Sequence, residues 1–369
     1  MKISKIRIRN NNINYPIFIG FGTINLIRKK IKNYCPAAKK IALVLDKNIP
    51  NKYKQKLKQQ LKNYKLFTYE YSVNENLKSF GKVNILVEDL LKNNFNRSDI
   101  LISAGGGIIG DFSGFAASIV KRGINFINVP STLLAQVDAS IGGKTGINSS
   151  KGKNLIGSFY QPKLVITELG FLKSLSKRNL VCGFAEILKH SLIYDKNFFN
   201  WINKNSKNIL EKLNLEILKL AIVKSCKIKS HFILMDEKEK NERMILNFGH
   251  TFAHGIEAAS NFSRKINHGE AVLIGIILAT RLSFRKKLCS FSTLNKIEDF
   301  YNVNSLPSKL DKNFLKKNSN KIVKYMVNDK KNTGDRISLI LLKKIGKTSN
   351  PGQVKITIGE MKKILKNIN

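Results

Sequence analysis

Acidic residues are scarce in this chain of 369 residues, which has 25 Asp and Glu against 65 Lys and Arg and a formal net charge of +40. Such a balance raises the question of a nucleic acid or an anionic membrane as partner. However, the basic residues form no separate arm, tail or aromatic-interleaved stripe, and lysine and asparagine are frequent throughout. We therefore interpret the charge as compositional bias and expect neither nucleic acid nor membrane as partner, although part of the charge could serve an acidic substrate.

Cysteine is rare as well, with four residues in the whole chain, Cys35, Cys182, Cys226 and Cys289. They contain no C-x-x-C pair, which argues against a cysteine-ligated zinc knuckle and against a disulfide framework. This usage fits a reducing compartment, and we expect the protein in the cytoplasm.

Long apolar runs are also missing. The longest, residues 271–279, is too short to cross a bilayer. The first nine residues alternate apolar and basic side chains, as a strand does, and lack the continuous apolar core of a signal peptide. The sequence therefore predicts no membrane anchor and no export signal.

The distribution of apolar residues predicts two domains, as the length also suggests. Short apolar runs separated by helical stretches occur at 41–45, 100–103, 124–129 and 164–167. Continuous apolar strands between helices are typical of a mainly parallel sheet that is covered on both faces. From about residue 180, apolar residues recur every three to four positions, over 209–235, 245–259 and 269–288, and one late strand is expected at 337–342. We predict an α/β domain over 1–176 and a mainly helical domain over 177–369.

The chain has only five histidines, and three of them, His250, His254 and His268, are candidate metal ligands together with Glu186. His250 and His254 are four residues apart, so on a helix they project from the same face one turn apart. His268 could supply a third nitrogen, and Glu186 could complete a site of two histidines and one carboxylate with an open position for substrate. Zinc suits such ligands, and cobalt or manganese also accept them. Each histidine alone is equally compatible with an ordinary half-buried polar residue.

A glycine turn follows the apolar run at 100–103 and leads into a small-residue helix, with Gly105, Gly106, Gly107 and Gly110 in the turn. Glycines let backbone amides approach a pyrophosphate, and a helix N-terminus adds partial positive charge, which favours a dinucleotide. The spacing differs from G-x-G-x-x-G, and glycine turns also serve tight packing. No Lys-Ser or Lys-Thr follows this turn as a Walker A motif requires, and a second loop, 141–146, lacks the leading glycine, so an ATPase or GTPase is disfavoured.

Residues 130–162 hold small residues, polar residues and lysines in a segment too long for an ordinary connection, which is typical of a functional loop. Lys144, Lys153 and Asn154, with Arg122 upstream, could bind carboxylate and phosphate oxygens through charge-assisted hydrogen bonds. Any one of these lysines alone could equally be a solvated surface group.

Together these segments resemble the 3-dehydroquinate synthases of the sugar-phosphate cyclase superfamily. The matching blocks are 105–111, 130–148, 152–162, 183–190, 246–254 and 268–272, in the order of the family and across nearly the whole chain. The resemblance implies a homodimer with an N-terminal, NAD-binding, Rossmann-like α/β domain and a mainly α-helical C-terminal domain that binds zinc, with the active site between them. The chain departs from the family pattern mildly. Ser131 replaces a usual threonine, Ala139 replaces a small hydroxyl residue, and only Glu75 and Lys78 match within 74–78.

The resemblance also implies roles for individual residues. The metal ligands are Glu186, His250 and His268, while His254 matches a histidine that adjoins the ligands or relays protons. The NAD-binding residues are Glu75, Lys78, Gly107, Ile108, Ile109, Gly110, Asp111, Ser131, Thr132, Lys144, Lys153, Phe171, Leu172, Lys173 and Ser174. The substrate-binding and catalytic residues are Arg122, Asp138, Lys144, Lys153, Asn154, Lys189, Lys229, Arg243, Asn247 and His254, with a further cation from Lys330 or Lys331.

The implied reaction converts 3-deoxy-D-arabino-heptulosonate 7-phosphate, a sugar phosphate, to 3-dehydroquinate and phosphate in the shikimate pathway of aromatic amino acid biosynthesis. It comprises oxidation by NAD, phosphate elimination, reduction, ring opening and an intramolecular aldol step. One alternative is a related cyclase that makes 2-deoxy-scyllo-inosose or a valiolone. Another is a metal-dependent alcohol or glycerol dehydrogenase, which would release NADH stoichiometrically. A basic nucleic-acid-binding protein would leave the motifs unexplained.

Overall fold

The computed structural model describes residues 2–260, 265–327 and 336–367. It divides into two compact units, of which unit 1 comprises Met1–Leu180 and Leu218–Ser230, and unit 2 comprises Val181–Ile217 and His231–Asn369. These units are defined by contacts within the structure, and the predicted domain boundary at residue 176 stays a prediction.

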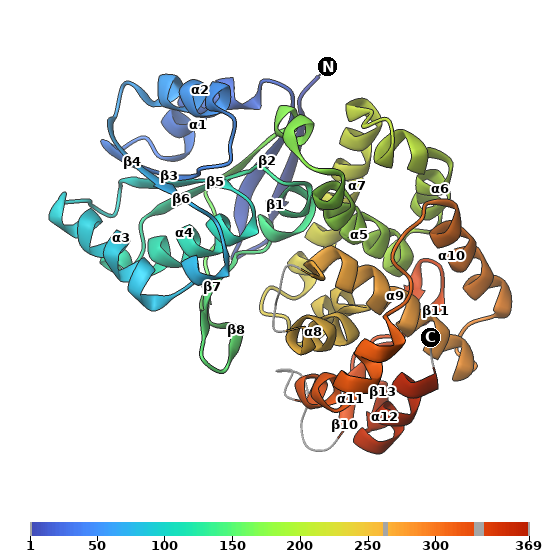
Figure 1. Ribbon diagram of the computed structural model, residues 1–369. Helices are drawn as coiled ribbons and strands as arrows, with labels where there is room; N and C mark the ends of the chain where they lie inside the picture. The colour runs from blue at the N-terminus through green and yellow to red at the C-terminus, as the bar shows by residue number, and fades with distance from the viewer. Residues whose placement is uncertain (1, 261–264, 328–335, 368–369) are drawn as a thin grey trace. The chain divides into compact units, whose positions relative to one another are not determined.

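Unit 1 is built on a seven-stranded sheet with the order β1-β2-β9-β6-β5-β3-β4 (Figure 1). The strands are β1 (Ser4–Arg9), β2 (Asn14–Gly20), β3 (Lys40–Asp46), β4 (Lys65–Tyr71), β5 (Ile100–Gly105), β6 (Asn125–Pro130) and β9 (Leu164–Glu168). Every neighbouring pair is parallel except β1 with β2. The predicted parallel sheet is therefore confirmed, with β1 as an antiparallel edge strand.

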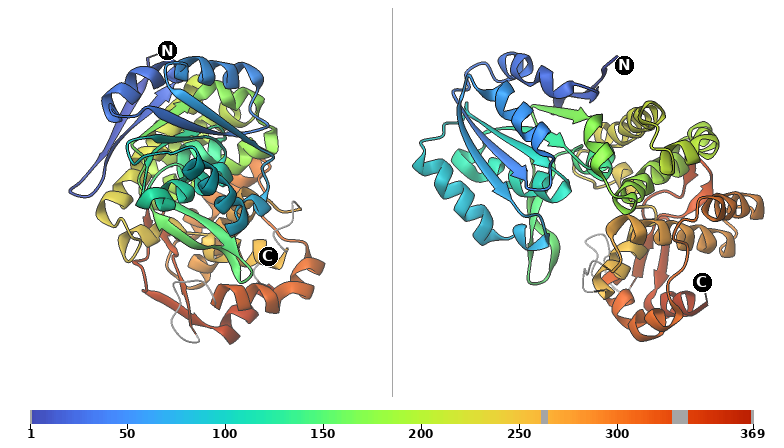
Figure 2. Two further views of the ribbon diagram at one scale, coloured as in Figure 1. Left: turned by 90° about the vertical axis from the view of Figure 1, so that its left-hand side faces the viewer. Right: turned by 45° about the horizontal axis from the view of Figure 1, so that its top comes forward.

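Helices cover both faces of this sheet because alternate residues of each strand point to opposite sides. The helices are α1 (Ile27–Tyr34), α2 (Asn51–Leu61), α3 (Phe80–Lys92) and α4 (Gly107–Ile119). In β3, Leu43 is buried in a cluster with residues of α1 and α2, whereas Val44 is buried in a second cluster with residues of α3 and α4. Figure 2 shows the blue helices and the cyan helices on opposite faces of the strands. Burial of each such side chain contributes roughly 1.5–3 kcal/mol.

The segment 130–162, expected to be a loop, is mostly regular structure. It forms a π-helix, η4 (Ala135–Ala139), and an antiparallel hairpin, β7 (Lys144–Ser149) with β8 (Gly152–Phe159). Ile147 and Ile156 face each other in the hairpin and pack against the cluster that contains α4, so the hairpin lies beside α4 (Figure 2). The loop interpretation was wrong because this single apolar pair is hidden among glycines and lysines.

Short 3₁₀ helices complete unit 1: η1 (Thr23–Leu26), η2 (Glu75–Leu77), η3 (Val120–Arg122) and η5 (Leu169–Ser174). Helices η2, η3 and η5, which follow β4, α4 and β9, contain or adjoin predicted site residues. Of the described helices, none has the combination of length and apolarity that crossing a membrane requires.

Unit 2 is mainly helical, as predicted. Its helices are α5 (Lys177–Tyr194), α6 (Lys196–Leu210), η6 (Glu242–Asn247), α8 (His250–Ala259), α9 (His268–Arg285), α10 (Phe291–Val303), α11 (Lys312–Val327) and α12 (Ile358–Asn367). Its strands form two small sheets, β10 (Arg336–Leu339) with β13 (Val354–Thr357) and β11 (Leu342–Lys344) with β12 (Lys347–Thr348). Helix α7 (Leu215–Met235) is shared, because its residues Leu218–Ser230 belong to unit 1.

Three predicted elements differ from the structure. The helix expected over 209–235 is interrupted after α6, and α7 begins anew where the Asn214 side chain accepts hydrogen bonds from the amides of Glu216 and Ile217. The helix expected over 245–259 is interrupted at Gly249, whose φ of 78° is left-handed. The strand expected at 337–342 is two strands, β10 and β11, with different partners.

Candidate metal centre and dinucleotide site

Glu186, His250 and His268 come together in unit 2 from three helices. Glu186 is fully buried in α5, and the two histidines are the first residues of α8 and α9. One ligand atom of each residue lies within 4.8 Å of the others. The Nε2 atoms of His250 and His268 are 3.4 Å and 3.8 Å from Oε1 of Glu186. Three groups that are remote in the sequence therefore form one potential ligand set.

A contact between two glycines allows the two histidines to approach. A Cβ on Gly275 of α9 would lie 2.1 Å from the carbonyl oxygen of Gly249, and a Cβ on Gly249 would lie 2.8 Å from the backbone nitrogen of Ile276. Only glycine permits so close a passage of α8 and α9, and the rings of His250 and His268 end 5.6 Å apart between centroids.

The charges of the triad favour deprotonated ligands at two positions. Burial acts to raise the pKa of Glu186, but Lys189, with which it forms a buried ion pair, and His250 hold that pKa well below its ordinary value. Burial, together with the charge of Lys189, lowers the pKa of His250 to about 4. For His268, burial is outweighed by the carboxylates of Glu257 and Glu186, which raise its pKa well above the ordinary value.

The triad fits a divalent metal. Both carboxylate oxygens of Glu186 are buried; the Lys189 ammonium lies against Oε2, whereas Oε1 faces the Nε2 atoms of His250 and His268. A cation held by Oε1 and the two Nε2 atoms would compensate this buried carboxylate from the side that Lys189 does not occupy. Two imidazoles and one carboxylate are ligands that zinc and cobalt accept.

His254 lies one turn after His250, with the two ring centroids 5.4 Å apart. It is exposed, and it is not a member of either candidate ligand group found among the described residues. The structure thus gives His254 a place beside the triad.

Two other predicted residues of unit 2, Arg243 and Asn247, lie on η6 and contact the loop before it. Arg243 is buried, and its Nη1 donates to the carbonyl oxygen of Glu237 at 2.5 Å. The side chain of Asn247 donates to Oε1 of Glu239 at 2.8 Å. Lys330 and Lys331 lie outside the described residues.

The predicted dinucleotide residues of unit 1 gather at one edge of the sheet. Residues 107–111, 131–132 and 171–174 directly follow β5, β6 and β9, which are neighbours in the sheet. In parallel sheets, ligands bind beyond the carboxyl ends of the strands, and a helix N-terminus there attracts a phosphate. Gly107, Ile108, Ile109, Gly110 and Asp111 form the first turns of α4.

Not every side chain in these segments can face a ligand. Ile109 is buried in the cluster with α4, and Phe171 and Leu172 are almost fully buried. The ring of Phe171 lies 4.6 Å from that of Tyr53, between centroids. Residues such as these can offer only backbone atoms, whereas Thr132 and Lys173 are not buried.

A polar network in unit 1 joins η2, α4 and β8. Lys78 is buried and lies 2.5 Å from Oδ2 of Asp111, and it also donates to Oδ1 of Asn154. Lys153 lies 2.8 Å from Oε1 of Glu75. Burial raises the pKa of Asp111 despite the charge of Lys78, whereas for Glu75 burial is outweighed by Lys153, Asn148 and Lys78 together, which lower the pKa. The network brings together five predicted residues from distant parts of the chain.

Asp138 and Lys229 form a second pair in unit 1, with Nζ of Lys229 2.7 Å from Oδ1 of Asp138. Arg122 ends η3 in a left-handed conformation, with φ of 62°, directly after Lys121 with φ of 51°. Its side chain is exposed.

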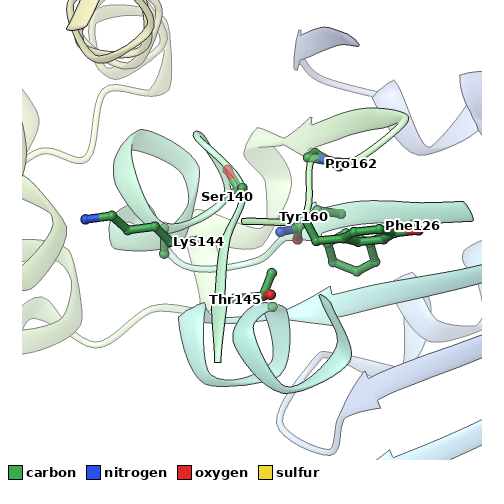
Figure 3. A pocket seen from close by; sticks show the side chains of 10 residues that line it. Phe126, Ser140, Lys144, Thr145, Tyr160 and Pro162 are labelled. Atoms are coloured by element: carbon green, nitrogen blue, oxygen red, sulfur yellow. The ribbon is translucent and has the colours of Figure 1, made fainter. Parts of the chain in front are cut away.

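A small pocket lies between α4 and the hairpin, and Lys144 is at its margin. It is lined by Gly110, Phe126, Asn128, Ala139, Ser140, Gly143, Lys144, Thr145, Tyr160 and Pro162. In Figure 3 the Lys144 side chain points away from the rings of Phe126 and Tyr160. Its ammonium group is therefore directed away from the aromatic side of the pocket.

Sequence reasoning missed three polar residues that contact the predicted site. They are Asn148, which donates to Oε2 of Glu75 at 2.9 Å, Glu239, which binds Asn247, and Glu257, whose Oε2 is 3.2 Å from Nδ1 of His268. A signal existed for Glu257, because it lies seven residues after His250 and so on the same helix face.

Together, the sheet edge and the triad define a class of enzyme with a Rossmann-like α/β domain and a mainly helical metal-binding domain. Comparison with known proteins is more specific. The 3-dehydroquinate synthase N-terminal model matches residues 68–182, and the C-terminal model matches residues 183–332. A 3-dehydroquinate synthase from Pelagibacter ubique is 47% identical over 346 residues, which is 94% of each chain. The chain belongs to the 3-dehydroquinate synthase family, and it is a phosphate-eliminating cyclase, as predicted.

Solved structures of related cyclases share the fold. A 2-deoxy-scyllo-inosose synthase, complexed with carbaglucose-6-phosphate, NAD+ and Co2+, has a TM-score of 0.84 at 24% identity and covers 100% of both chains. A 2-epi-5-epi-valiolone synthase from Streptomyces hygroscopicus, with NAD+ and Zn2+ bound, has a TM-score of 0.82 at 22% identity and covers 98% of both chains. At these identities the likeness concerns the fold alone, which confirms the predicted fold class.

Proposed function

We propose that the residues described above carry out the reaction of the family, the conversion of 3-deoxy-D-arabino-heptulosonate 7-phosphate to 3-dehydroquinate and phosphate. The observation that carries the proposal is the triad of Glu186, His250 and His268, whose ligand atoms lie within 4.8 Å of one another. The 47% identity to a 3-dehydroquinate synthase supports the choice of substrate.

Glu186, His250 and His268 would hold zinc, or cobalt in its place. Two structural neighbours are described with Co2+ or Zn2+ and with NAD+, which supports both cofactors. When bound, the metal supplies a Lewis acid that lowers the pKa of a substrate hydroxyl. Residues 107–111, 131–132 and 171–174, with Glu75, Lys78 and Lys153, would hold NAD at the sheet edge, where it would supply a hydride acceptor.

The cationic residues bind an anionic substrate and stabilise negative charge as it develops. In unit 1, Arg122, Lys144 and Lys153 are the candidates, with Asn154 as a neutral donor. Lys229 holds the Asp138 carboxylate in one orientation through its 2.7 Å contact. In a site of fixed donors, the loss of phosphate from the substrate requires little rearrangement of the protein.

In unit 2, Lys189 provides a cation that burial and its ion pair with Glu186 keep in place. Arg243 and Asn247 orient substrate oxygens from η6. His254, exposed beside His250, is positioned to exchange a proton at its imidazole with the substrate or with water. Holding both reacting carbons in one conformer favours the final aldol step.

We also propose that the protein acts as a homodimer in the cytoplasm. Both statements rest on the family resemblance, and the scattered cysteines support the location.

The decisive experiment measures phosphate release from the heptulosonate with trace NAD. We expect stoichiometric phosphate and 3-dehydroquinate without net NADH, loss of activity after treatment with a chelator, and recovery with zinc or cobalt. Full activity of metal-free protein would contradict the metal assignment. Turnover only with the sugar phosphate of a related cyclase, or net NADH from a simple alcohol, would instead support one of the alternatives.

A further inference from the structure

Glu257 is a buried carboxylate next to the metal triad, and none of the roles proposed above includes it. It lies in α8 with 9% of its surface exposed. Its Oε2 atom is 3.2 Å from Nδ1 of His268, the first residue of α9. A buried carboxylate is costly unless its partner compensates it, so the contact calls for an explanation.

The two histidines of the triad share one arrangement. Nδ1 of His250 lies 3.3 Å from the carbonyl oxygen of Phe248, and Nδ1 of His268 faces Glu257. The Nε2 atoms of both rings lie nearest Oε1 of Glu186. An imidazole with an acceptor at Nδ1 carries a proton there and leaves the Nε2 lone pair for a metal. The two rings differ in one respect, since only His268 has a charged acceptor.

Two separate sets of contacts hold His268 in place. Its backbone is held by the N-terminus of α9, where the Asn267 side chain accepts from the amide of Glu270 and the Glu270 side chain accepts from the amide of Asn267. Its ring is held by Glu257 of α8, a helix that packs against α9. The capping box fixes the backbone of His268, and the contact of Glu257 with Nδ1 leaves Nε2 to face Glu186.

We propose that Glu257 is a positioning residue of the metal centre, which keeps Nε2 of His268 directed at the metal and strengthens that nitrogen as a ligand through its negative charge. The inference rests on the proposed function, because it requires a metal at Glu186, His250 and His268. With Glu186, the carboxylate of Glu257 brings two negative charges to a divalent cation.

The test compares Glu257→Ala and Glu257→Gln with the unsubstituted full-length protein. Zinc affinity is measured by competition with a chromogenic chelator, and the geometry of the site is read from the visible absorption spectrum after loading with Co2+. For Glu257→Ala we expect about 10- to 100-fold weaker zinc binding and an altered Co2+ spectrum. Glu257→Gln keeps an acceptor oxygen without the charge, so we expect an intermediate affinity and a spectrum closer to that of the parent.

Glu298→Ala is the matched control. Glu298 of α10 also pairs with α9, since its carboxylate lies 2.8 Å from Nε of Arg281. The substitution therefore removes a carboxylate partner from the same helix, near its other end. We expect the zinc affinity and Co2+ spectrum of this variant to be unchanged, because the loss of an ion pair elsewhere on α9 does not alter the ring orientation of His268.

Parent-like zinc affinity and a parent-like Co2+ spectrum in Glu257→Ala would overturn the proposal. If circular dichroism shows that this variant does not fold, Glu257→Gln decides, and parent-like values for both measurements in that variant overturn it equally. An unsubstituted protein that binds no zinc would instead refute the metal site and with it the proposed function.

Discussion

At the scale of single residues, Lys153 illustrates how the cationic site depends on fixed side chains. Its ammonium group lies 2.8 Å from Glu75, and its side chain is 22% exposed. Removal of one preorganised donor at such a site commonly costs about 3 kcal/mol, or roughly a hundredfold in rate. We therefore predict that Lys153→Ala folds normally but loses at least about a hundredfold in turnover, measured by phosphate release.

Lys151→Ala is the control for Lys153→Ala, because Lys151 is exposed in the turn of the same hairpin. We expect this variant to retain full turnover. An equal rate in the Lys153 variant would contradict the role assigned to its ammonium group.

Asp236 gives a pH-dependent contribution to stability. Its carboxylate accepts hydrogen bonds from the amides of Lys240, Asn241 and Arg243, which outweigh burial and lower its pKa. A native pKa below the unfolded value stabilises the fold above the ordinary aspartate pKa, about 3.9, and this contribution disappears as the pH falls through the native pKa. In Asp236→Asn we predict a lower free energy of unfolding near neutral pH and a smaller difference from the parent in acid. Urea unfolding of both proteins at several pH values measures the difference in free energy of unfolding. A difference that is independent of pH would contradict the proposed contribution of the Asp236 carboxylate.

The sequence predicted chemically distinctive residues better than their contacts. The motifs around Glu186, His250 and His268 indicated the triad, but spacing alone equally favoured His254, because a four-residue interval says only that two side chains share a helix face. The contact of Glu257 with His268 could not be predicted, since it depends on how closely α8 and α9 pack.

At the scale of elements, strands were easier to predict than the ends of helices. The apolar runs that became β3, β5, β6 and β9 are buried on both faces, so their composition marks them clearly. Apolar spacing, by contrast, continues from α6 into α7 across the break that Asn214 caps. The hairpin β7–β8 was missed because its stability comes from packing on α4 rather than from its own composition.

From the glycine contact between α8 and α9 we predict that substitution of Gly275 weakens metal binding. In Gly275→Ala the added Cβ would meet the carbonyl oxygen of Gly249 at 2.1 Å, so the helices must separate and His250 must move away from His268. We expect a lower melting temperature, from strain of roughly 1–3 kcal/mol, and a reduced zinc content after dialysis.

Gly359→Ala is the matched control, because Gly359 lies in α12 and a Cβ there meets nothing within 4 Å. The same substitution in this helix should stabilise the protein by up to about 1 kcal/mol and leave the zinc content unchanged. Retention of zinc by the Gly275 variant would show that the helix spacing does not determine the site.

At the scale of the whole molecule, α7 contributes its residues Leu218–Ser230 to unit 1, although the first segment of unit 1 ends at Leu180. Within unit 1, the thiol of Cys226 lies 3.3 Å from the carbonyl oxygen of Gln136, and Lys229 binds Asp138. A fragment of residues 1–176 lacks these partners. We predict that it unfolds without a cooperative thermal transition, whereas a fragment of residues 1–230 unfolds cooperatively, as followed by near-ultraviolet circular dichroism. Equally sharp transitions in both fragments would show that unit 1 does not need α7.

The shared helix also determines when unit 1 can be completed on the ribosome. After Leu180 has been synthesised, a further 50 residues, Val181–Ser230, must be added before the last segment of unit 1 exists. The first part of unit 2, Val181–Ile217, therefore leaves the exit tunnel while unit 1 is still unfinished. Because domains generally fold as units during synthesis, the contacts of Gln136 and Asp138 with α7 can form only after this interval, so unit 1 completes its folding late in synthesis.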